Sequence, residues 1–224
     1  MNADTPTAPN PIPQGPITAL LYGGSFDPPH AAHLTLPLRV RDAIGAGLVV
    51  YIPAACSPFK EHAPTASNDQ RVAMLRAGLA GEDRVAIATL EFEREGPSYT
   101  VDTLRRLREE RPDAALRLLV GADQARSFHK WRDAHTIVQL APPVVMLRPG
   151  EGDGAELLDE LRTHWDDDAT ARWSDGLAPI DEVVDASSTG VRTLLAQHRD
   201  SPRLDDLLAP AVRGFIEREG LYSA

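Results

Sequence analysis

The sequence is short of cysteine, of long apolar runs and of positive charge, and each shortage excludes a class of protein. Cys56 is the one cysteine in 224 residues, so an intrachain disulfide is excluded and a reducing cytoplasm is the expected location. No stretch approaches the roughly 20 apolar residues that a membrane-spanning helix needs. The formal net charge of −10 argues against broad binding to nucleic acid or to an anionic membrane.

The rest of the composition is that of an ordinary globular protein. Hydrophobic residues make up 42% of the chain and charged residues 25%, which is enough for one domain with a hydrophobic core. Residues 1–16 contain five prolines and no apolar run, so we expect a disordered N-terminal tail rather than a signal peptide. Residues 17–224 are then expected to form a single domain.

The most informative segment is residues 20–35, with the sequence LLYGGSFDPPHAAHLT. An apolar run that stops at Gly23 and Gly24, followed by Asp-Pro-Pro, predicts a strand, a tight turn and the start of a helix. Glycines lack a Cβ, so a phosphate can approach the backbone there and meet the free N–H groups of the first helical turn. His30 and His33 would share one face at the positive end of that helix. Together these donors suit a triphosphate.

Two other interpretations of this segment are less specific. The histidines could be packing or surface residues, because a single histidine or a glycine pair is weak evidence for a site. Histidines spaced three residues apart can also share a zinc ion, but no cysteine or carboxylate cluster nearby supplies the remaining ligands. We therefore predict no metal bound by the protein itself and favour a nucleotide site.

From residue 17 onward, apolar runs typical of strands alternate with amphipathic segments typical of helices. Leu48–Ile52 is a continuous apolar run, as expected for a strand buried on both faces of a parallel sheet. Pro37 is expected to kink the first helix or to separate its first turn. The alternation predicts an α/β fold with a Rossmann-like doubly wound parallel sheet and flanking helices. We expect strands at residues 17–22, 48–52, 84–92, 116–120, 144–147 and 180–184, and helices at about residues 29–43, 67–79, 98–111, 131–140, 155–165, 187–195 and 210–216.

Several motifs stand at the carboxyl ends of the expected strands, where ligands bind in this fold. Carboxyl ends of parallel strands share one edge of the sheet, so the motifs are expected to form one site. Taken alone, residues 187–192 would be interpreted as a capped helix with a surface arginine. The motifs are Gly23 and Gly24 after the first strand, Lys60 in a Ser-Pro-Phe-Lys loop after the second, Gly121–Asp123 after a middle strand, and Ser187–Arg192 after the last.

Residues 23–33 resemble the signature of the nucleotidyltransferase superfamily with the His-x-x-His motif, and residues 185–192, DASSTGVR, resemble its second motif, ISSTxIR. The resemblance extends over nearly all of residues 17–222. Phe59 stands where the related loops commonly have histidine, and residues 151–180 do not align. The central motifs are similar to those of bacterial nicotinate mononucleotide adenylyltransferases, namely GPSYTVDTL at 96–104, Gly-Ala-Asp at 121–123 with Trp131 eight residues later, Arg-Pro-Gly at 148–150 and Gly-Leu-Tyr at 220–222.

The resemblance implies a role for each motif. His30 and His33 would stabilise charge on the α-phosphate of ATP and on the departing pyrophosphate. Lys60 and Arg192 would assist electrostatically, and Asp123 would contact a ribose hydroxyl. The other implied contacts are with ATP, through Gly23, Gly24, Ser25, Phe26, Gly121, Ser187, Ser188 and Thr189.

The pyridine side of the site would be formed by Thr100 and Trp131. The resemblance implies that Trp131 stacks on the pyridine ring and that Thr100 helps to bind its carboxylate. From the residues alone, Trp131 could instead belong to the core, and Thr100 could be no more than a helix cap.

The implied activity is transfer of the adenylyl group of ATP to nicotinate mononucleotide, which gives nicotinate adenine dinucleotide and pyrophosphate in NAD biosynthesis. The 5′-phosphate is already a charged nucleophile near neutral pH, so neither a general base nor a covalent intermediate is needed, and Mg²⁺ would arrive on the ATP phosphates. A nicotinamide mononucleotide adenylyltransferase would use the same machinery. Another adenylyl- or cytidylyltransferase is disfavoured by the central motifs, and a non-catalytic nucleotide-binding protein by the presence of both histidines and Arg192. No oligomeric state is predicted.

Overall fold

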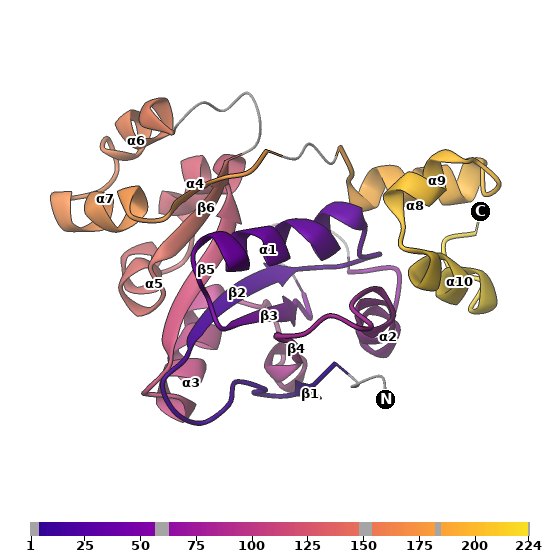
Figure 1. The fold of residues 1–224 in the computed structure, drawn as a ribbon, viewed down its shortest axis with the longest axis horizontal. Helices are drawn as coiled ribbons and strands as arrows, with labels where there is room; N and C mark the ends of the chain where they lie inside the picture. The colour runs from indigo at the N-terminus through magenta and orange to yellow at the C-terminus, as the bar shows by residue number, and fades with distance from the viewer. Residues whose placement is uncertain (1–4, 57–62, 148–153, 182–184, 224) are drawn as a thin grey trace.

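The computed structural model describes residues 5–56, 63–147, 154–181 and 185–223, which are arranged as helices around one sheet (Figure 1). The sheet is seven-stranded, and every pair of neighbouring strands is parallel, in the order β1-β4-β3-β2-β5-β6-β7. The order changes direction at β2, which pairs with β3 on one side and with β5 on the other. The predicted Rossmann-like doubly wound fold is confirmed, and its ligand crevice is expected at the carboxyl ends of β2 and β5.

The elements alternate along the chain as βα units require. The strands are β1 (Thr7–Ala8), β2 (Thr18–Gly24), β3 (Leu48–Pro53), β4 (Val85–Ala88), β5 (Ala115–Gly121), β6 (Pro143–Leu147) and β7 (Leu177–Pro179). The α-helices are α1 (Ala31–Ala43), α2 (Asn68–Gly78), α3 (Thr100–Glu110), α4 (Ala122–Ser127), α5 (Ala134–Leu140), α6 (Ala155–Leu161), α7 (Asp167–Ser174), α8 (Ser188–Gln197), α9 (Arg203–Leu207) and α10 (Pro210–Arg218), with short 3₁₀ helices η1 (Leu90–Glu93) and η2 (Phe128–Lys130).

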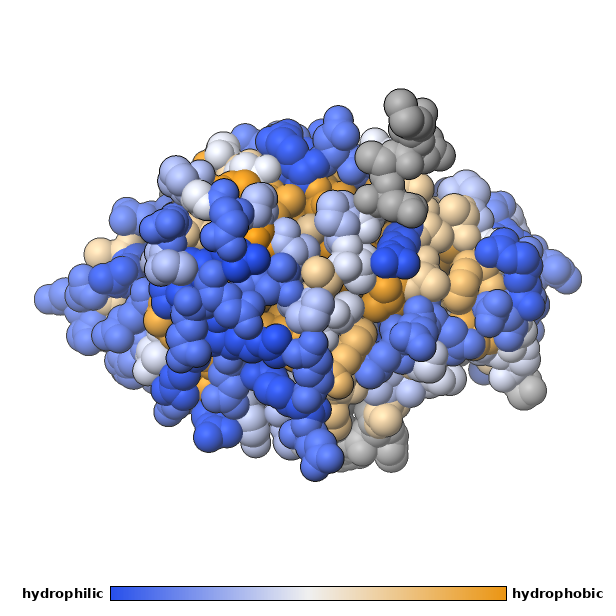
Figure 2. All heavy atoms as spheres, turned by 90° about the horizontal axis from the view of Figure 1, so that it is seen from below, coloured by the Kyte–Doolittle hydropathy of each residue, from blue (hydrophilic) through white to orange (hydrophobic). Residues whose placement is uncertain are grey.

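The sheet separates two hydrophobic cores. Successive side chains of a strand point to opposite faces, so Leu20 and Leu21 belong to different cores. Leu20 packs with residues of α1, α2, α8 and α10, and Leu21 packs with residues of α3, α5, α6 and α7. Hydrophilic residues cover much of the outer surface in the view of Figure 2. None of the described helices is long and apolar enough to cross a membrane.

Pro37 does not separate the first turn of α1, which was one of the two expected outcomes, since the helix is one element from Ala31 to Ala43. A proline has no N–H to donate to the carbonyl four residues earlier, which here belongs to His33. The hydroxyl of Tyr51, on the buried strand β3, donates to that carbonyl at 3.1 Å instead. A side chain from the neighbouring strand therefore replaces the hydrogen bond that the proline removes.

The N-terminal segment is ordered where the structure describes it, which corrects the expectation of a disordered tail for residues 5–16. Thr7 and Ala8 form β1 and pair with β4. Ile12 is only 1% exposed, and the Arg111 side chain donates to its carbonyl at 2.6 Å. β1 supplies hydrogen-bond partners to backbone groups of β4 that would otherwise lie at the edge of the sheet. A strand of two residues needs no apolar run, so the sequence pattern does not reveal it.

Two expected strands have other bounds. The strand expected at residues 84–92 ends at Ala88, and η1 follows. The polar–apolar alternation is misleading there because Glu91, at a polar position, is buried. The strand expected at residues 180–184 is replaced by β7, of which residue 179 is the last, and residues 182–184 lie outside the described ranges. β7 starts directly after Gly176. The backbone of Gly176 lies so close to Pro143 that a Cβ on Gly176 would come within 2.0 Å of the Pro143 carbonyl oxygen.

The helices around residues 131–174 also differ from expectation. The helix expected from Trp131 begins at Ala134, because η2 is a separate turn and Asp133 adopts a left-handed conformation with φ of +51°. The helix expected at residues 155–165 ends at Leu161. A further helix, α7, follows it with Asp166 as its N-cap, and no expected element corresponds to this helix.

Candidate active site

His30 and His33 lie at the start of α1, directly after the turn that ends β2. His30 is the N-cap residue, and its backbone N–H donates to Nδ1 of His33 at 3.4 Å. The two rings are stacked, with centroids 3.6 Å apart and an angle of 20° between their planes. Because Nδ1 of His33 accepts, the neutral ring carries its proton on Nε2 and can donate there. The structure thus places two imidazole donors at one helix N-terminus.

The turn between β2 and α1 is built around the ring of Phe26. Phe26 is fully buried with φ of +48°, and its ring centroid lies 5.1 Å from that of His33 and 5.7 Å from that of Tyr22. A Cβ on Gly24 would come within 2.9 Å of the Phe26 ring, so glycine is required at that position. The side chain of Phe26 therefore belongs to the core and shapes the turn from inside.

The buried carboxylate of Asp27 ties this turn to two other parts of the chain. Its oxygens accept the backbone N–H of Thr65 at 2.8 Å and of Ala66 at 3.0 Å, and the hydroxyl of Tyr222 at 2.7 Å. Burial, together with the hydrogen bond to Asp27, raises the pKa of Tyr222, so its hydroxyl stays protonated and remains a donor. The penultimate described residue of the chain is therefore part of the architecture of the site.

Side chains from α2 and α8 hold the carbonyl groups of the same turn. The fully buried Arg71 donates to the carbonyl of Ser25 at 2.7 Å. Arg192 donates to the carbonyl of Asp27 at 2.6 Å, and the Ser188 hydroxyl donates to the carbonyl of Pro28 at 2.9 Å. The last two bonds join the first and last motifs, which lie about 160 residues apart in the sequence.

The N-terminus of α8 lies beside that of α1. Ser187 caps α8 by accepting the N–H of Gly190 at 3.1 Å, and Thr189 accepts from Arg192 at 3.3 Å. Ser188, the first residue of α8, contacts Pro28, which is two residues before the N-cap of α1. Each helix N-terminus carries partial positive charge, so two such ends side by side favour an anion between them.

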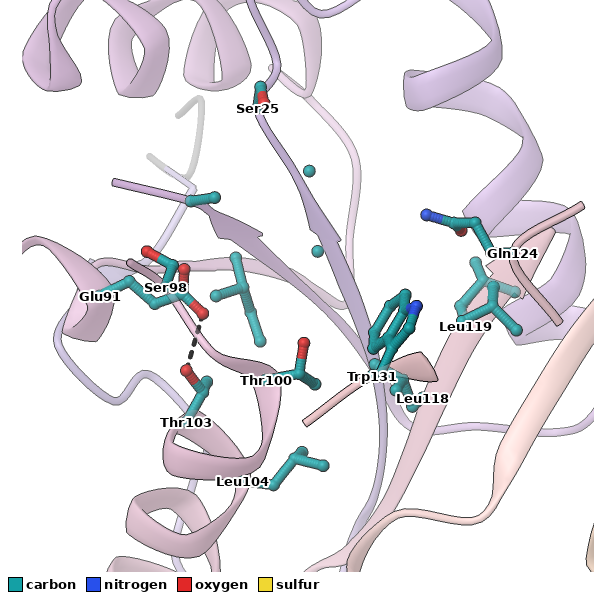
Figure 3. Close-up of a pocket in the computed structure, with 15 residues that line it drawn as sticks. Ser25, Glu91, Ser98, Thr100, Thr103, Leu104, Leu118, Leu119, Gln124 and Trp131 are labelled. Carbon is teal, nitrogen blue, oxygen red and sulfur yellow. Dashed lines mark hydrogen bonds between the residues drawn. The ribbon is translucent and has the colours of Figure 1, made fainter. Parts of the chain in front are cut away.

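A pocket extends from the glycine turn along the carboxyl ends of β2 and β5 (Figure 3). It brings together five of the predicted site residues, with the glycine turn at one end and residues of α3 and the η2 turn at the other. Trp131 is half-buried, so part of its ring packs on the core and part faces the pocket. The pocket is lined by Gly23, Gly24, Ser25, Ile52, Ala54, Glu91, Ser98, Thr100, Thr103, Leu104, Leu118, Leu119, Val120, Gln124 and Trp131.

A buried carboxylate lies in the pocket wall. Glu91 accepts the hydroxyl of Thr103 at 2.7 Å (Figure 3), and a guanidinium nitrogen of Arg94 lies 3.8 Å away. Burial raises the pKa of Glu91, although hydrogen bonds from Thr103 and Ser98 oppose the rise. The Ser98 oxygen also accepts the N–H of Ala55 at 3.1 Å. This network therefore connects η1, the start of α3 and the loop after β3.

Comparisons with known proteins agree on one family. The sequence model of the cytidylyltransferase-like family matches residues 21–194. A probable nicotinate-nucleotide adenylyltransferase of Acidithiobacillus ferrooxidans is 38% identical over 92% of this chain and 95% of its own length. Another, from Chromobacterium violaceum, is 37% identical over 90% of this chain and 97% of its own length. The chain belongs to the nicotinate-nucleotide adenylyltransferases.

The fold of this adenylyltransferase is shared with solved structures. Plasmodium falciparum nicotinic acid mononucleotide adenylyltransferase complexed with NaAD superimposes with a TM-score of 0.71, covering 92% of this chain and 97% of that one. The two sequences are 17% identical, so the likeness concerns the fold.

The structure does not bring every expected residue of the adenylyltransferase into the pocket. The Asp123 side chain is 90% exposed and lies 3.6 Å from Arg126, with which it forms an ion pair. The next residue, Gln124, lines the pocket, and its side-chain oxygen accepts the N–H of Gly121 at 3.3 Å. The side chain that this motif turns toward the pocket is thus the glutamine rather than the predicted aspartate.

Part of the expected site lies outside the described residues, namely Phe59 and Lys60 in the loop after β3 and the Arg-Pro-Gly motif at residues 148–150. Among the residues that the structure does describe, no group of three or more His, Cys, Asp or Glu side chains could hold a metal ion. Arg71 and Glu91 are not among the predicted site residues, and Tyr222 was named only as part of the Gly-Leu-Tyr motif, without a role. Arg71 and Glu91 are charged residues in amphipathic segments, where a solvated position is the ordinary expectation, and only their burial reveals them.

Proposed function

We propose that this protein transfers the adenylyl group of ATP to nicotinate mononucleotide, forming nicotinate adenine dinucleotide and pyrophosphate as a step of NAD biosynthesis. The observation that carries the proposal is the meeting of two unlike half-sites at Gly24 and Ser25. One half has His30, His33 and two helix N-termini, which suit phosphates. The other is the pocket with Thr100 and Trp131, which suits an aromatic ring. The named relatives support the choice of substrates.

The reaction needs positioning and charge stabilisation more than acid–base chemistry. The 5′-phosphate of the mononucleotide is an anion near neutral pH, so it can attack the α-phosphorus of ATP in line without losing a proton to the protein. Its P–O bond forms as the bond from the α-phosphorus to the bridging oxygen breaks, and pyrophosphate takes the negative charge. His30 and His33 are proposed to donate to the phosphate oxygens on which charge accumulates.

Arg192 and Lys60 are proposed to stabilise the triphosphate electrostatically. Arg192 is held beside the turn by its bonds to the Asp27 carbonyl and the Thr189 hydroxyl, so it needs little reorganisation to meet a phosphate. The hydroxyls of Ser187 and Thr189 stand at the same helix end. Mg²⁺ is proposed to enter with ATP, bound to its phosphates, where it neutralises the leaving group.

Preference for the acid over the amide follows from the start of α3. Thr100 is the first residue of this helix, and its N-cap, Tyr99, provides no side-chain cap. The partial positive charge of this helix end and the Thr100 hydroxyl favour a carboxylate on the pyridine ring. A carboxamide has the same shape but no charge, and its NH₂ group would face donors.

The remaining proposals concern the setting of the reaction. We propose that residues 17–224 act as a single nucleotidyltransferase domain, to whose sheet residues 5–16 add β1. We also propose that it has no nucleic-acid or membrane partners and acts in the cytoplasm, where both nucleotide substrates are expected. The proposed function is tested by incubating the protein with ATP, Mg²⁺ and nicotinate mononucleotide and separating the products. Nicotinate adenine dinucleotide and pyrophosphate should appear in equal amounts. Pyrophosphate formed only with another substrate pair, such as ATP with phosphopantetheine or CTP with an alcohol phosphate, would reject it.

A further inference from the structure

We infer that an aromatic cluster of Phe128, Trp165 and Trp173 positions the ring of Trp131, so that α7 controls the affinity of the pyridine pocket. The inference rests on the proposed function, in which Trp131 stacks on the pyridine ring. It assigns a positioning role to residues 155–174, which the central motifs do not cover.

The 3₁₀ geometry of η2 creates the first contact of this cluster. Three residues complete one turn of a 3₁₀ helix, so the side chains of residues i and i+3 lie above one another. The N–H of Trp131 closes the turn by donating to the carbonyl of Phe128 at 2.9 Å. The two rings are therefore stacked, with centroids 4.4 Å apart and an angle of 20° between their planes. The orientation of Phe128 thus sets the plane of the Trp131 ring.

Phe128 is in turn held by two tryptophans that come later in the chain. It is fully buried, and the edge-to-face contact with Trp173 has a centroid distance of 5.1 Å and an angle of 82°. Trp165 lies 6.2 Å from Phe128 and 5.7 Å from Trp173. Trp173 is on α7 and is fully buried, so its own orientation is fixed by the core. The rings form a continuous series from α7 through Phe128 to the face of Trp131 in the pocket.

The chain after Trp131 is fastened to the opposite wall of the pocket. The guanidinium of Arg132 lies 4.6 Å from the ring centroid of Tyr99, and Asp133 accepts from Arg105 at 3.2 Å. Tyr99 is the N-cap of α3, the helix of Thr100, and Arg105 lies in the middle of that helix. These partly exposed contacts fix the distance between the two walls, whereas the buried aromatic series fixes the tilt of the indole.

A matched pair of variants isolates the aromatic contact. Trp165→Phe/Trp173→Phe and Trp165→Phe/Trp173→Leu both leave Trp131 as the one tryptophan, and they differ only in whether residue 173 is aromatic. Quenching of Trp131 fluorescence by nicotinate mononucleotide then reports its dissociation constant directly. We expect this dissociation constant to be roughly two- to tenfold larger in the Leu variant, because that variant lacks one aromatic contact. The KM for ATP should be the same in both variants.

Each outcome has a distinct meaning. Equal mononucleotide affinities in the two variants, with quenching present, would overturn the inference and leave the proposed function intact. Absence of both quenching and turnover in a folded Phe variant would instead reject the proposed function. If the Leu variant does not fold, Phe128→Leu in the natural sequence provides the test, with Phe215→Leu on α10 as the control. A rise in the KM for the mononucleotide alone supports the inference, and an equal rise for both substrates contradicts it.

Discussion

The hydroxyl of Tyr222 donates to the carboxylate of Asp27 at 2.7 Å, although the two residues are 195 positions apart. The same carboxylate accepts two backbone N–H groups from Thr65 and Ala66, and the carbonyl of Asp27 accepts from Arg192. One residue of the turn after β2 therefore binds the C-terminal segment, the segment at residues 65–66 and the motif at residues 187–192. The active site depends on contacts that are remote in sequence.

Tyr222→Phe removes the hydroxyl and leaves the ring. We expect a loss of about 1.5–3 kcal/mol of stability, because a hydrogen bond to a buried carboxylate is lost, and a fall in Tm of roughly 3–10 °C. Turnover should also fall, since Asp27 holds Arg192. The control is Ser223→Ala, which removes a neighbouring exposed hydroxyl that donates to Gly220. Thermal unfolding of both variants is the measurement, and equal Tm values would show that the Asp27 contact contributes nothing.

Glu91→Gln separates the charge of the buried network from its shape. Burial raises the pKa of Glu91 above its ordinary value of 4.5. Because the pKa of Glu91 is higher in the folded than in the unfolded state, its protonation stabilises the fold below pH 4.5. This stabilisation is lost as the pH rises through the pKa of Glu91 in the folded state. The natural protein should therefore lose stability relative to Glu91→Gln between pH 5 and pH 8. Tm values of both proteins at the two pH values test this, and a difference that stays constant or grows in favour of glutamate would contradict it.

His30→Ala and His33→Ala should each lower kcat by about 10²–10³, the usual loss when one preorganised donor to developing charge is removed. His198→Ala, at an exposed position beyond α8, is the control and should leave kcat unchanged. Thermal unfolding shows whether each variant is folded. Near-normal turnover in both site variants would remove the histidines from the mechanism.

The fold was predictable because its signals are local. Leu48–Ile52 is a continuous apolar run, and it forms the buried strand β3. Ser67 and Pro210 stand at the starts of α2 and α10 as their capping and N1 preferences predict. The glycine turn and His30 are local as well, so the motif alone indicates where β2 ends and α1 begins.

The remaining features could not be predicted because their causes lie elsewhere in the chain. Pro37 reads as a helix breaker, and only the hydroxyl of Tyr51 on another strand explains why the helix continues. Asp123 is the conspicuous residue of its motif, yet the first turn of α4 directs Gln124 to the pocket. Trp131 was ambiguous between core and ligand. Phe128 covers part of its ring and the pocket meets another part, while its contact with a ligand stays a prediction.

The measurement that most directly tests the central claim is a comparison of kcat/KM for nicotinate mononucleotide and nicotinamide mononucleotide at saturating ATP. The charge-assisted hydrogen bonds that a carboxylate gains near Thr100 and the start of α3 predict a preference for the acid by about tenfold or more. Equal values for the two mononucleotides, or a higher value for the amide, would contradict the account of the pyridine pocket and the substrate assigned to it.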